Sequence, residues 1–335
     1  MSKAIFLIQD INQYKRVYGP TTVQKLLNTY EMTDKVYNRQ EVLSEPENFA
    51  DVEYIFSTWS MPAFTEEEIK NCFPALKCVY YGAGSVQGFA RPFLNCGVRV
   101  FSAWGANAVP VAETSLAQII LANKGFFSNM IMMKTHGYNQ ARSYYEKEYP
   151  GNYNVDVGII GAGMIGKIVI ELLKPFNIRV KVFDPFLPDE KAEEMGVTKT
   201  TLEDIFASCQ TISNHLANNP QTQNILNYDL FKLMKPTATF INTGRGQQVV
   251  EEDLIKALKE EPSRMAVLDV TWPEPPVEGS EITCLPNIYL TTHTAGSSGF
   301  ETWRMAEYMY DESLLVLEGK PTRYEVTLKM LETMA

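Results

Sequence analysis

The sequence has few of the residues that build metal sites and disulfide frameworks, and it lacks long apolar runs. Its five cysteines, at positions 72, 78, 96, 209 and 284, show no CxxC spacing and no partnering histidines. We therefore expect no metal site and no disulfides, with the cysteines reduced and in the core. No apolar run approaches the roughly 18 residues of a membrane helix. The apolar opening at residues 4–8 is also too short for a signal-peptide core, so we expect a cytoplasmic protein.

Basic residues are also scarce, because 30 Lys and Arg face 40 Asp and Glu, a net charge of −10. This balance argues against nucleic acid or an anionic membrane as a partner. An anionic substrate would have to meet a local positive group. Only three histidines are available for proton transfer, namely His136, His215 and His293.

Residues 155–185, VDVGIIGAGMIGKIVIELLKPFNIRVKVFDP, predict a nucleotide-binding βαβ unit. A short apolar strand leads into Gly161, which permits a tight turn. Gly163 lets the backbone approach a pyrophosphate, and Gly166 lets the following helix pack close to the strand. The second strand ends at Asp184, which is placed to accept hydrogen bonds from a ribose diol. Since residues 185–190 contain no Arg or Lys, the motif favours NAD over NADP.

The length of 335 residues favours two domains, and strand-like runs at 4–8, 52–56, 76–81 and 98–101 predict a first α/β domain with a parallel sheet. A capping box at Thr65–Glu68 predicts a helix that ends near Cys72. A glycine-rich loop at 82–88 follows the third of these strands. It suits either a small-anion site or a simple turn, and Phe-Ala-Arg-Pro directly after it leaves no room for a regular helix.

The remaining chain continues the alternation of strands and helices. A helix over 111–124, closed by Gly125, is expected to lead into the second domain. We expect the Met-rich stretch 126–149 to serve the core or a subunit interface, because Met fills irregular apolar gaps. Strands near 211–215, 238–242, 265–269 and 288–291 would complete a six-stranded doubly wound sheet. A final helix from about 300, stopped at Gly319, is expected to return to the first domain.

Polar residues recur where these later strands end, which is the edge at which open α/β sheets bind ligands. They are His215, the segment Asn242–Gly246, Asp269 with Glu274, and His293. Reduction of a 2-oxo acid needs a cation for the carboxylate and carbonyl, and we expect Arg245 to supply it. It also needs a proton donor, for which His293 is the candidate. A carboxylate beside His293 would favour the protonated ring, and Glu274 is the expected partner.

Three segments resemble the signature blocks of the D-isomer-specific 2-hydroxyacid dehydrogenases: FINTGRGQQVVEEDLIKAL, AVLDVTWPEPP and LPNIYLTTHTAG. The segment GIIGAGMIGKIV is similar to the NAD fingerprint of that family. The resemblance implies a catalytic set of Arg245, Glu274 and His293, and backbone N–H groups of Ala83 and Gly84 on the substrate carboxylate. It implies these cofactor-binding residues: Gly161, Gly163, Met164, Ile165, Gly166, Asp184, His215, Thr243, Gly244, Asp269, Ala295 and Gly296.

The resemblance also implies two Rossmann-like domains and a homodimer. We expect a doubly wound, parallel-sheet NAD domain at 105–297, and a smaller flavodoxin-like substrate domain at 1–104 plus 298–335. Ala217, Thr292 and Gly244 depart from residues common in the family, which weakens any inference about the substrate. We expect no C-terminal regulatory domain of the kind found in long-form phosphoglycerate dehydrogenases.

The expected function is therefore NAD-dependent interconversion of a 2-oxo acid and a D-2-hydroxy acid. Two alternatives stay open. One is an NAD(H)-sensing binding protein that keeps the catalytic residues but turns over little. The other is an enzyme similar to formate dehydrogenase, against which Glu274 argues, because that relative pairs its histidine with glutamine.

Overall fold

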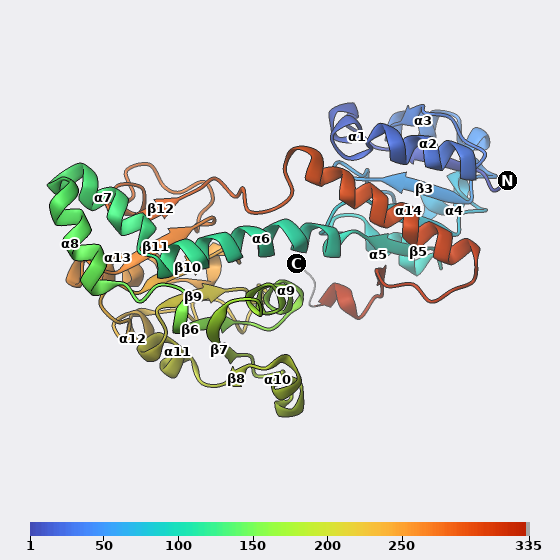
Figure 1. Cartoon of the computed structure of the whole chain (residues 1–335). Helices are drawn as coiled ribbons and strands as arrows, with labels where there is room; N and C mark the ends of the chain where they lie inside the picture. Colours follow the sequence, from blue (N-terminus) through green and yellow to red (C-terminus); the bar gives the residue numbers. More distant parts are fainter. Residues whose placement is uncertain (333–335) are drawn as a thin grey trace. The chain divides into compact units, whose positions relative to one another are not determined.

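The structure, a computed structural model, describes residues 1–332 (Figure 1). The chain forms two compact units. Within the described residues, unit 1 contains Met1–Asn107 and residues 297–332, and unit 2 contains Ala108–Gly296. Each unit has its own parallel sheet, which confirms the expected α/β class with two Rossmann-like folds.

The sheet of unit 1 has the strand order β13-β5-β4-β3-β1-β2. Apart from the edge strand β13, which runs antiparallel to β5, this is the flavodoxin-like order expected from the sequence. The strands are β1 (Ala4–Leu7), β2 (Val36–Tyr37), β3 (Tyr54–Ser57), β4 (Cys78–Tyr81), β5 (Arg99–Ser102) and β13 (Glu325–Val326). The two-residue strands β2 and β13 were not predicted, because they are too short to show a periodic pattern.

Helices cover both faces of this sheet. They are α1 (Ile11–Val17), α2 (Pro20–Thr29), α3 (Arg39–Ser44), η1 (Pro46–Phe49), α4 (Glu66–Cys72), α5 (Ala90–Asn95), η4 (Gly299–Thr302), α14 (Trp303–Leu317) and η5 (Met330–Glu332). Thr65 and Glu68 cap α4 reciprocally, as predicted. The expectation of no helix after the glycine loop was wrong, since α5 begins at Ala90. Its six residues fit because Pro92 lies in the first turn, where no N–H is needed.

The core of unit 1 is rich in aromatic side chains. Phe56, Tyr80 and Phe101 stack on neighbouring strands with ring centroids 5.0 Å apart at each step. Met305 and Met309 of α14 are fully buried in the same core. The returning C-terminal helix is therefore an integral part of unit 1.

The sheet of unit 2 is entirely parallel, with the order β12-β11-β10-β9-β6-β7-β8. This is a doubly wound arrangement that reverses direction beside β6. The strands are β6 (Tyr153–Ile160), β7 (Asn177–Phe183), β8 (Thr198–Lys199), β9 (Thr211–Asn214), β10 (Thr239–Asn242), β11 (Met265–Leu268) and β12 (Ile288–Leu290). The prediction of six strands was wrong by one, because β8 is a polar, exposed two-residue strand without an apolar signal.

Helix α6 (Trp104–Asn123) starts seven residues earlier than predicted, and its residues from Ala108 onward belong to unit 2. Pro110 marks a typical helix start, but here it lies inside the helix. The other helices of unit 2 are α7 (Phe126–His136), α8 (Tyr138–Glu148), α9 (Met164–Leu173), α10 (Asp189–Met195), α11 (Leu202–Ser208), α12 (Tyr228–Phe231), η2 (Gly246–Gln248), α13 (Glu251–Glu260) and η3 (Glu281–Thr283). Gly125 adopts the expected left-handed conformation, at φ +65°.

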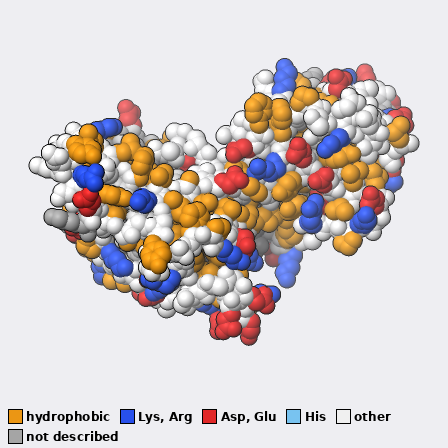
Figure 2. Space-filling view, in the orientation of Figure 1, with side chains coloured by type: hydrophobic (Ala, Val, Ile, Leu, Met, Phe, Trp, Pro, Cys, Tyr) orange, Lys and Arg blue, Asp and Glu red, His pale blue; other side chains and the backbone are white. Residues whose placement is uncertain are grey.

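The Met-rich stretch forms the pair α7 and α8. Several of its large apolar side chains are exposed, namely Phe126, Met130, Met133 and Tyr138. Figure 2 shows hydrophobic side chains on the surface in the region where Figure 1 places α7. Of the two roles expected for this stretch, the core role therefore does not account for these four residues.

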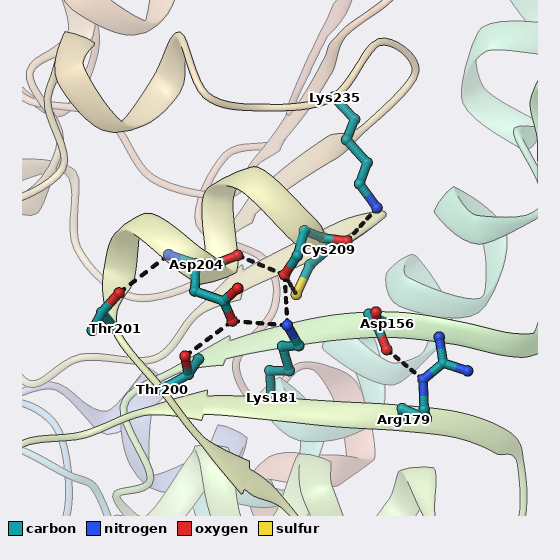
Figure 3. A network of polar contacts seen from close by, with 9 residues as sticks. Asp156, Arg179, Lys181, Thr200, Thr201, Asp204, Cys209 and Lys235 are labelled. Atoms are coloured by element: carbon teal, nitrogen blue, oxygen red, sulfur yellow. Dashed lines mark hydrogen bonds and ion pairs between the residues drawn. The ribbon is translucent and has the colours of Figure 1, made fainter.

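A polar network joins α11 to β7 of unit 2 (Figure 3). The Lys181 ammonium on β7 lies 2.8 Å from the Asp204 carboxylate and 2.9 Å from the Ser208 hydroxyl. Asp156 and Arg179 pair across β6 and β7 at 2.6 Å. Next to this network, burial raises the pKa of Cys209 to about 11, so the thiol stays protonated. The network thus holds a helix to the sheet and leaves no reactive thiolate.

The cysteines only partly follow the prediction. All five are free, and Cys72, Cys78 and Cys209 are buried. Cys96 is half-buried and Cys284 is exposed, so these two were wrongly assigned to the core. Across residues 1–332 there is no group of His, Cys, Asp and Glu side chains suited to a metal ion. No helix in the described chain is long and apolar enough to cross a membrane.

Candidate active site

The dinucleotide turn between β6 and α9 has three glycines in different surroundings. Gly161 has φ +92°, and its N–H donates to the Phe183 carbonyl at 2.8 Å. A Cβ on Gly166 would lie 2.0 Å from the Gly161 carbonyl oxygen, so the start of α9 packs directly on the turn. At Gly163, in contrast, a Cβ would meet nothing within 4 Å. The open side of the turn is therefore at Gly163, beside the N-terminus of α9.

The first turn of α9 suits a diphosphate. Gly163 is the N-cap residue and provides no side chain to bind the first N–H groups of the helix. Met164 is exposed and Ile165 is half-buried at this end. Free N–H groups and the positive end of the helix dipole both favour an anion here. The residues present thus fit the pyrophosphate of a dinucleotide.

Asp184, at the end of β7, has a structural role that the sequence does not reveal. One carboxylate oxygen accepts the Ala162 N–H and the other accepts the Phe186 N–H, both at 2.8 Å. The half-buried carboxylate therefore fixes the dinucleotide turn. Since each carboxylate oxygen accepts two hydrogen bonds, capacity remains for ribose hydroxyls.

One cation near the end of β7 was not predicted, because it is distant from Asp184 in the sequence. The Lys199 ammonium on β8 donates to the Leu187 carbonyl at 2.6 Å and pairs with Asp189 at 2.9 Å. Lys199 lies near the end of β7 because β8 pairs with β7 in the sheet. Its charge is already balanced by Asp189.

His215 is buried at the end of β9. Its Nε2 lies 2.9 Å from the Ser213 hydroxyl, and its Nδ1 lies 3.5 Å from the Thr243 hydroxyl. Burial lowers the pKa of His215 to about 4, so the ring is neutral at neutral pH. The Thr243 hydroxyl also contacts Ser115 of α6 at 3.1 Å. His215 is therefore a packing and hydrogen-bonding residue, and it is not a proton donor near pH 7.

A cluster of amide side chains supports the loop after β10. The Asn214 amide donates to Asn242 at 2.9 Å and to Gln248 at 2.7 Å. Asn242 in turn accepts the Gly244 N–H at 3.0 Å, and Gln248 accepts the Arg245 N–H at 3.2 Å. The cluster is buried, so it fixes the backbone on both sides of Arg245. The strand-end position of Asn214 is the signal that identifies it in the sequence.

Arg245 is exposed, and its Nη1 donates to the Gly244 carbonyl at 2.8 Å. A Cβ on Gly246 would lie 2.1 Å from the Thr271 backbone, and one on Gly244 would meet the amide cluster. Protein atoms thus fill the space beside both glycines, so a side chain at either position would have to displace them.

His293 and Glu274 form the closest pair of titratable groups in the site. Nδ1 of His293 lies 2.8 Å from Oε1 of Glu274, and both side chains are less than half exposed (44% and 41%). His293 adopts φ +59°, a left-handed conformation that few non-glycine residues take. With Nδ1 bound to the carboxylate, Nε2 is the nitrogen left to act on a substrate.

Asp269 holds the loop that carries His293. Its buried carboxylate accepts the Thr291 hydroxyl at 2.6 Å, the Thr294 N–H at 2.7 Å and the Ala295 N–H at 3.0 Å. Its carbonyl accepts the His293 N–H at 2.9 Å. These contacts position the loop, and the expected role of Asp269 at the cofactor stays a prediction. Gly296, the last residue of unit 2, ends that loop.

Glu251 of α13 is a further supporting residue that was missed. Its carboxylate accepts the Trp272 N–H at 2.6 Å, two residues before Glu274. Burial raises the pKa of Glu251. The sequence gives little indication of this role, because Glu251 is one of three acidic residues in the first turn of α13.

The glycine loop of unit 1 differs from its prediction at one residue. The Ala83 N–H already donates to the Tyr81 carbonyl at 2.8 Å, and Ala83 is fully buried. Its carbonyl accepts the Ser102 hydroxyl at 2.9 Å. Within residues 1–332 no hydrogen bond of the Gly84 N–H is found, and the space beside Gly84 is open. Gly84 is therefore the residue of this loop that is able to donate to a ligand.

Fold and site together define a Rossmann-type dinucleotide-binding unit with an Arg, Glu and His set at its strand ends. Residues 116–295, more than half of the chain, match the NAD-binding domain model of the D-isomer specific 2-hydroxyacid dehydrogenases. The chain belongs to this family, and its cofactor is NAD.

The chain is similar to several known proteins, which are named as different enzymes. D-3-phosphoglycerate dehydrogenase of Bacillus subtilis is 29% identical over 69% of the chain and 43% of its own length. Glyoxylate reductase of Aeropyrum pernix is 33% identical over 49% of each chain. A phosphoglycerate oxidoreductase from Rhizobium etli has a similar fold, with a TM-score of 0.82 at 20% identity over 99% of this chain and 100% of its own. The matched part is thus about half the length of the two curated relatives.

Proposed function

We propose that the chain is an NAD-dependent oxidoreductase that interconverts a 2-oxo acid and a D-2-hydroxy acid by hydride transfer. The observation that carries the proposal is the 2.8 Å contact between His293 and Glu274, in the unit whose strand ends also present the exposed Arg245. An imidazole oriented by a carboxylate is suited to general acid and base catalysis. A guanidinium is suited to a carboxylate and a polarised carbonyl.

Each residue of the set has a distinct role in this proposal. NADH, when bound, supplies the hydride to the carbonyl carbon. Arg245 binds the substrate carboxylate and carbonyl oxygen through its forked N–H groups. His293 gives the proton at Nε2 to the new alkoxide, and Glu274 orients the ring through its 2.8 Å contact with Nδ1. In the reverse direction neutral His293 accepts that proton.

We propose that unit 1 is the substrate domain, corresponding to the expected boundaries 1–104 and 298–335. The free N–H of Gly84 supports this assignment, because a backbone N–H at the carboxyl end of a strand suits a small anion. Within unit 1 we assign the Gly84 N–H as a donor to the substrate carboxylate. Ala83 is not included, since its N–H is engaged.

The proposed function is tested with a panel of 2-oxo acids and NADH, followed by the loss of NADH absorbance. We expect turnover of at least one acid at ordinary enzyme rates, on the order of 1–10³ per second. Chiral analysis of the product should give the D-hydroxy acid. Tight NADH binding without turnover of any acid would contradict the proposal and favour an NAD(H)-sensing protein.

We predict that NADH is preferred over NADPH, because the Asp184 carboxylate would bind the ribose diol and repel a 2′-phosphate. Asp184→Asn should narrow the ratio of kcat/KM between the two cofactors. Asparagine keeps one acceptor for the Ala162 N–H, so the dinucleotide turn is better preserved than with alanine. Steady-state kinetics with both cofactors measure the effect.

Two further variants make this test specific. Glu190→Gln removes a carboxylate from the nearby exposed helix α10 and should leave the cofactor ratio unchanged. Lys199→Gln tests whether the Lys199 ammonium on β8 helps to bind the 2′-phosphate of NADPH. Equal kcat/KM for NADH and NADPH in the unmutated protein would show that Asp184 does not select the cofactor.

We also propose a homodimer that forms around α7 and α8 of unit 2. The exposed apolar side chains of this pair, together with the preference of soluble oligomers for two-fold symmetry, support it. A cytoplasmic location is proposed as well, and the five free cysteines support a reducing compartment.

A further inference from the structure

Arg16, in α1 of unit 1, is a cation without a carboxylate partner among the described residues. Its guanidinium carbon lies 4.5 Å from the centroid of the Trp59 ring. Three other arginines in unit 1 also stack on aromatic rings, and each of them pairs with a glutamate. These pairs are Arg39 with Glu68, Arg99 with Glu325, and Arg323 with Glu312. Arg16 is stacked in the same way, but its charge is not neutralised.

The backbone that carries Arg16 is fixed next to the glycine loop. The Arg16 carbonyl accepts the Thr302 hydroxyl at 2.5 Å. A Cβ on Gly82 would lie 3.2 Å from a methyl carbon of Val17, the residue after Arg16. The Tyr18 hydroxyl donates to the Ser57 carbonyl, at the end of β3, at 2.8 Å. The end of α1 therefore packs on the carboxyl ends of β3 and β4.

Trp59, the stacking partner, belongs to the same edge of the sheet. Thr58, directly before it, donates from its buried hydroxyl to the Gly82 carbonyl at 2.7 Å. Ser60, directly after it, has φ +65° and accepts the Asp10 N–H on its hydroxyl oxygen at 2.9 Å. The loop at 58–60 is thus tied both to the glycine loop and to the end of β1. Trp59 and Arg16 are held beside the loop that contains the free Gly84 N–H.

We infer that Arg16, held over Trp59, recognises a second anionic group at the far end of the substrate. The preferred substrate would then be a 2-oxo acid with a second carboxylate or a phosphate. This rests on the proposed function, in which Gly84 binds the carboxylate next to the reacting carbonyl. An arginine stacked on a ring keeps the N–H groups at its edge free for an oxyanion and loses less side-chain freedom on binding. In a chain of net charge −10, such an uncompensated cation favours an anionic ligand locally.

The test compares matched substrates in the full-length protein with NADH. 2-Oxoglutarate is paired with 2-oxohexanoate, and 3-phosphohydroxypyruvate is paired with hydroxypyruvate. In each pair the second member lacks the distal negative charge. The variants are Arg16→Gln, which removes the charge, and Arg16→Lys, which keeps it. Lys15→Gln is the control, because Lys15 is the exposed neighbouring cation on the same helix.

We expect the unmutated protein to favour the member with the distal negative charge in at least one pair. Arg16→Gln should lower kcat/KM for that member by about tenfold, mainly through KM, which corresponds to about 1.4 kcal/mol. The member without the distal charge should change by less than about twofold. Lys15→Gln should have little effect, and Arg16→Lys should retain part of the preference. The pair that responds identifies the second group as a carboxylate or a phosphate.

Other outcomes overturn the inference. If Arg16→Gln lowers kcat/KM equally for both members, Arg16 only stabilises the fold of unit 1. If the unmutated protein favours the acids without the distal charge, a second anionic group is not recognised, although the proposed function stands. If no acid is turned over, the proposed function fails, and binding of 2-oxoglutarate and 3-phosphohydroxypyruvate to the NADH complex is measured by NADH fluorescence. Binding that is absent, or unchanged in Arg16→Gln, then overturns the inference as well.

Discussion

Replacing His293 with asparagine is expected to lower kcat for 2-oxo-acid reduction by a factor of about 10²–10⁴, the range for loss of a general acid or base. Asparagine suits this test, because it tolerates the left-handed backbone that His293 adopts at φ +59°. The loop held by Asp269 should therefore keep its conformation. NADH affinity, measured by fluorescence titration, should remain close to that of the unmutated protein.

The matched control is His136→Asn, at an exposed histidine near the end of α7. This variant should keep the unmutated rate. His215 does not offer an alternative acid near neutral pH, because burial lowers its pKa to about 4. A His293→Asn protein with unchanged kcat would mean that the proton comes from a group outside the proposed set.

Arg245→Lys is expected to lower kcat/KM by roughly 30- to 700-fold. This corresponds to a loss of about 2–4 kcal/mol of transition-state stabilisation, the scale for loss of an oriented electrostatic contact. Lysine keeps the positive charge but has no forked pair of donors. In the structure Nη1 of Arg245 also donates to the Gly244 carbonyl, so the guanidinium fixes its own orientation. An ammonium group does not combine that contact with a bidentate contact to a carboxylate. Both kcat and KM are measured with the best acid of the panel.

Arg264→Lys provides the contrast for this experiment. Arg264 donates to the backbone carbonyls of Met234, Ala257 and Lys232, so its role is structural. We expect this variant to lower thermal stability and to leave kcat/KM nearly unchanged. If Arg245→Lys behaved in the same way, the cation that binds the substrate would have to be sought elsewhere.

The fold was largely predictable, because strong local signals coincide with the elements that define it. The apolar strand before Gly161, the three glycines and the acid at 184 occur in one continuous stretch, so the nucleotide-binding unit follows from local sequence. The strands β2, β8 and β13 were missed, because each has only two residues and is too short to show an alternating apolar pattern. Pro110 concealed the first turns of α6, because its usual place is the start of a helix.

The candidate site was predictable in its residue types and less so in its contacts. Arg245, Glu274 and His293 follow from chemistry and from the strand-end rule. Asp184 and Asp269 accept hydrogen bonds from backbone N–H groups that the turns bring close to them. The pattern of side chains in the sequence does not predict such backbone contacts. The same holds for Ala83, whose N–H is engaged by the carbonyl of Tyr81. The stacking of Arg16 on Trp59 depends on how α1 packs against the sheet.

The left-handed backbone at His293 bears on how such a protein changes in evolution. Codons for asparagine and aspartate differ from those of histidine by a single base, and both residues tolerate this conformation well. A single-base change would therefore remove the proposed acid and leave the loop in place. The dinucleotide turn, which lies at residues 161–166, is unaffected by such a change. An NAD-binding regulator without turnover is thus only one substitution away from an enzyme built on this scaffold.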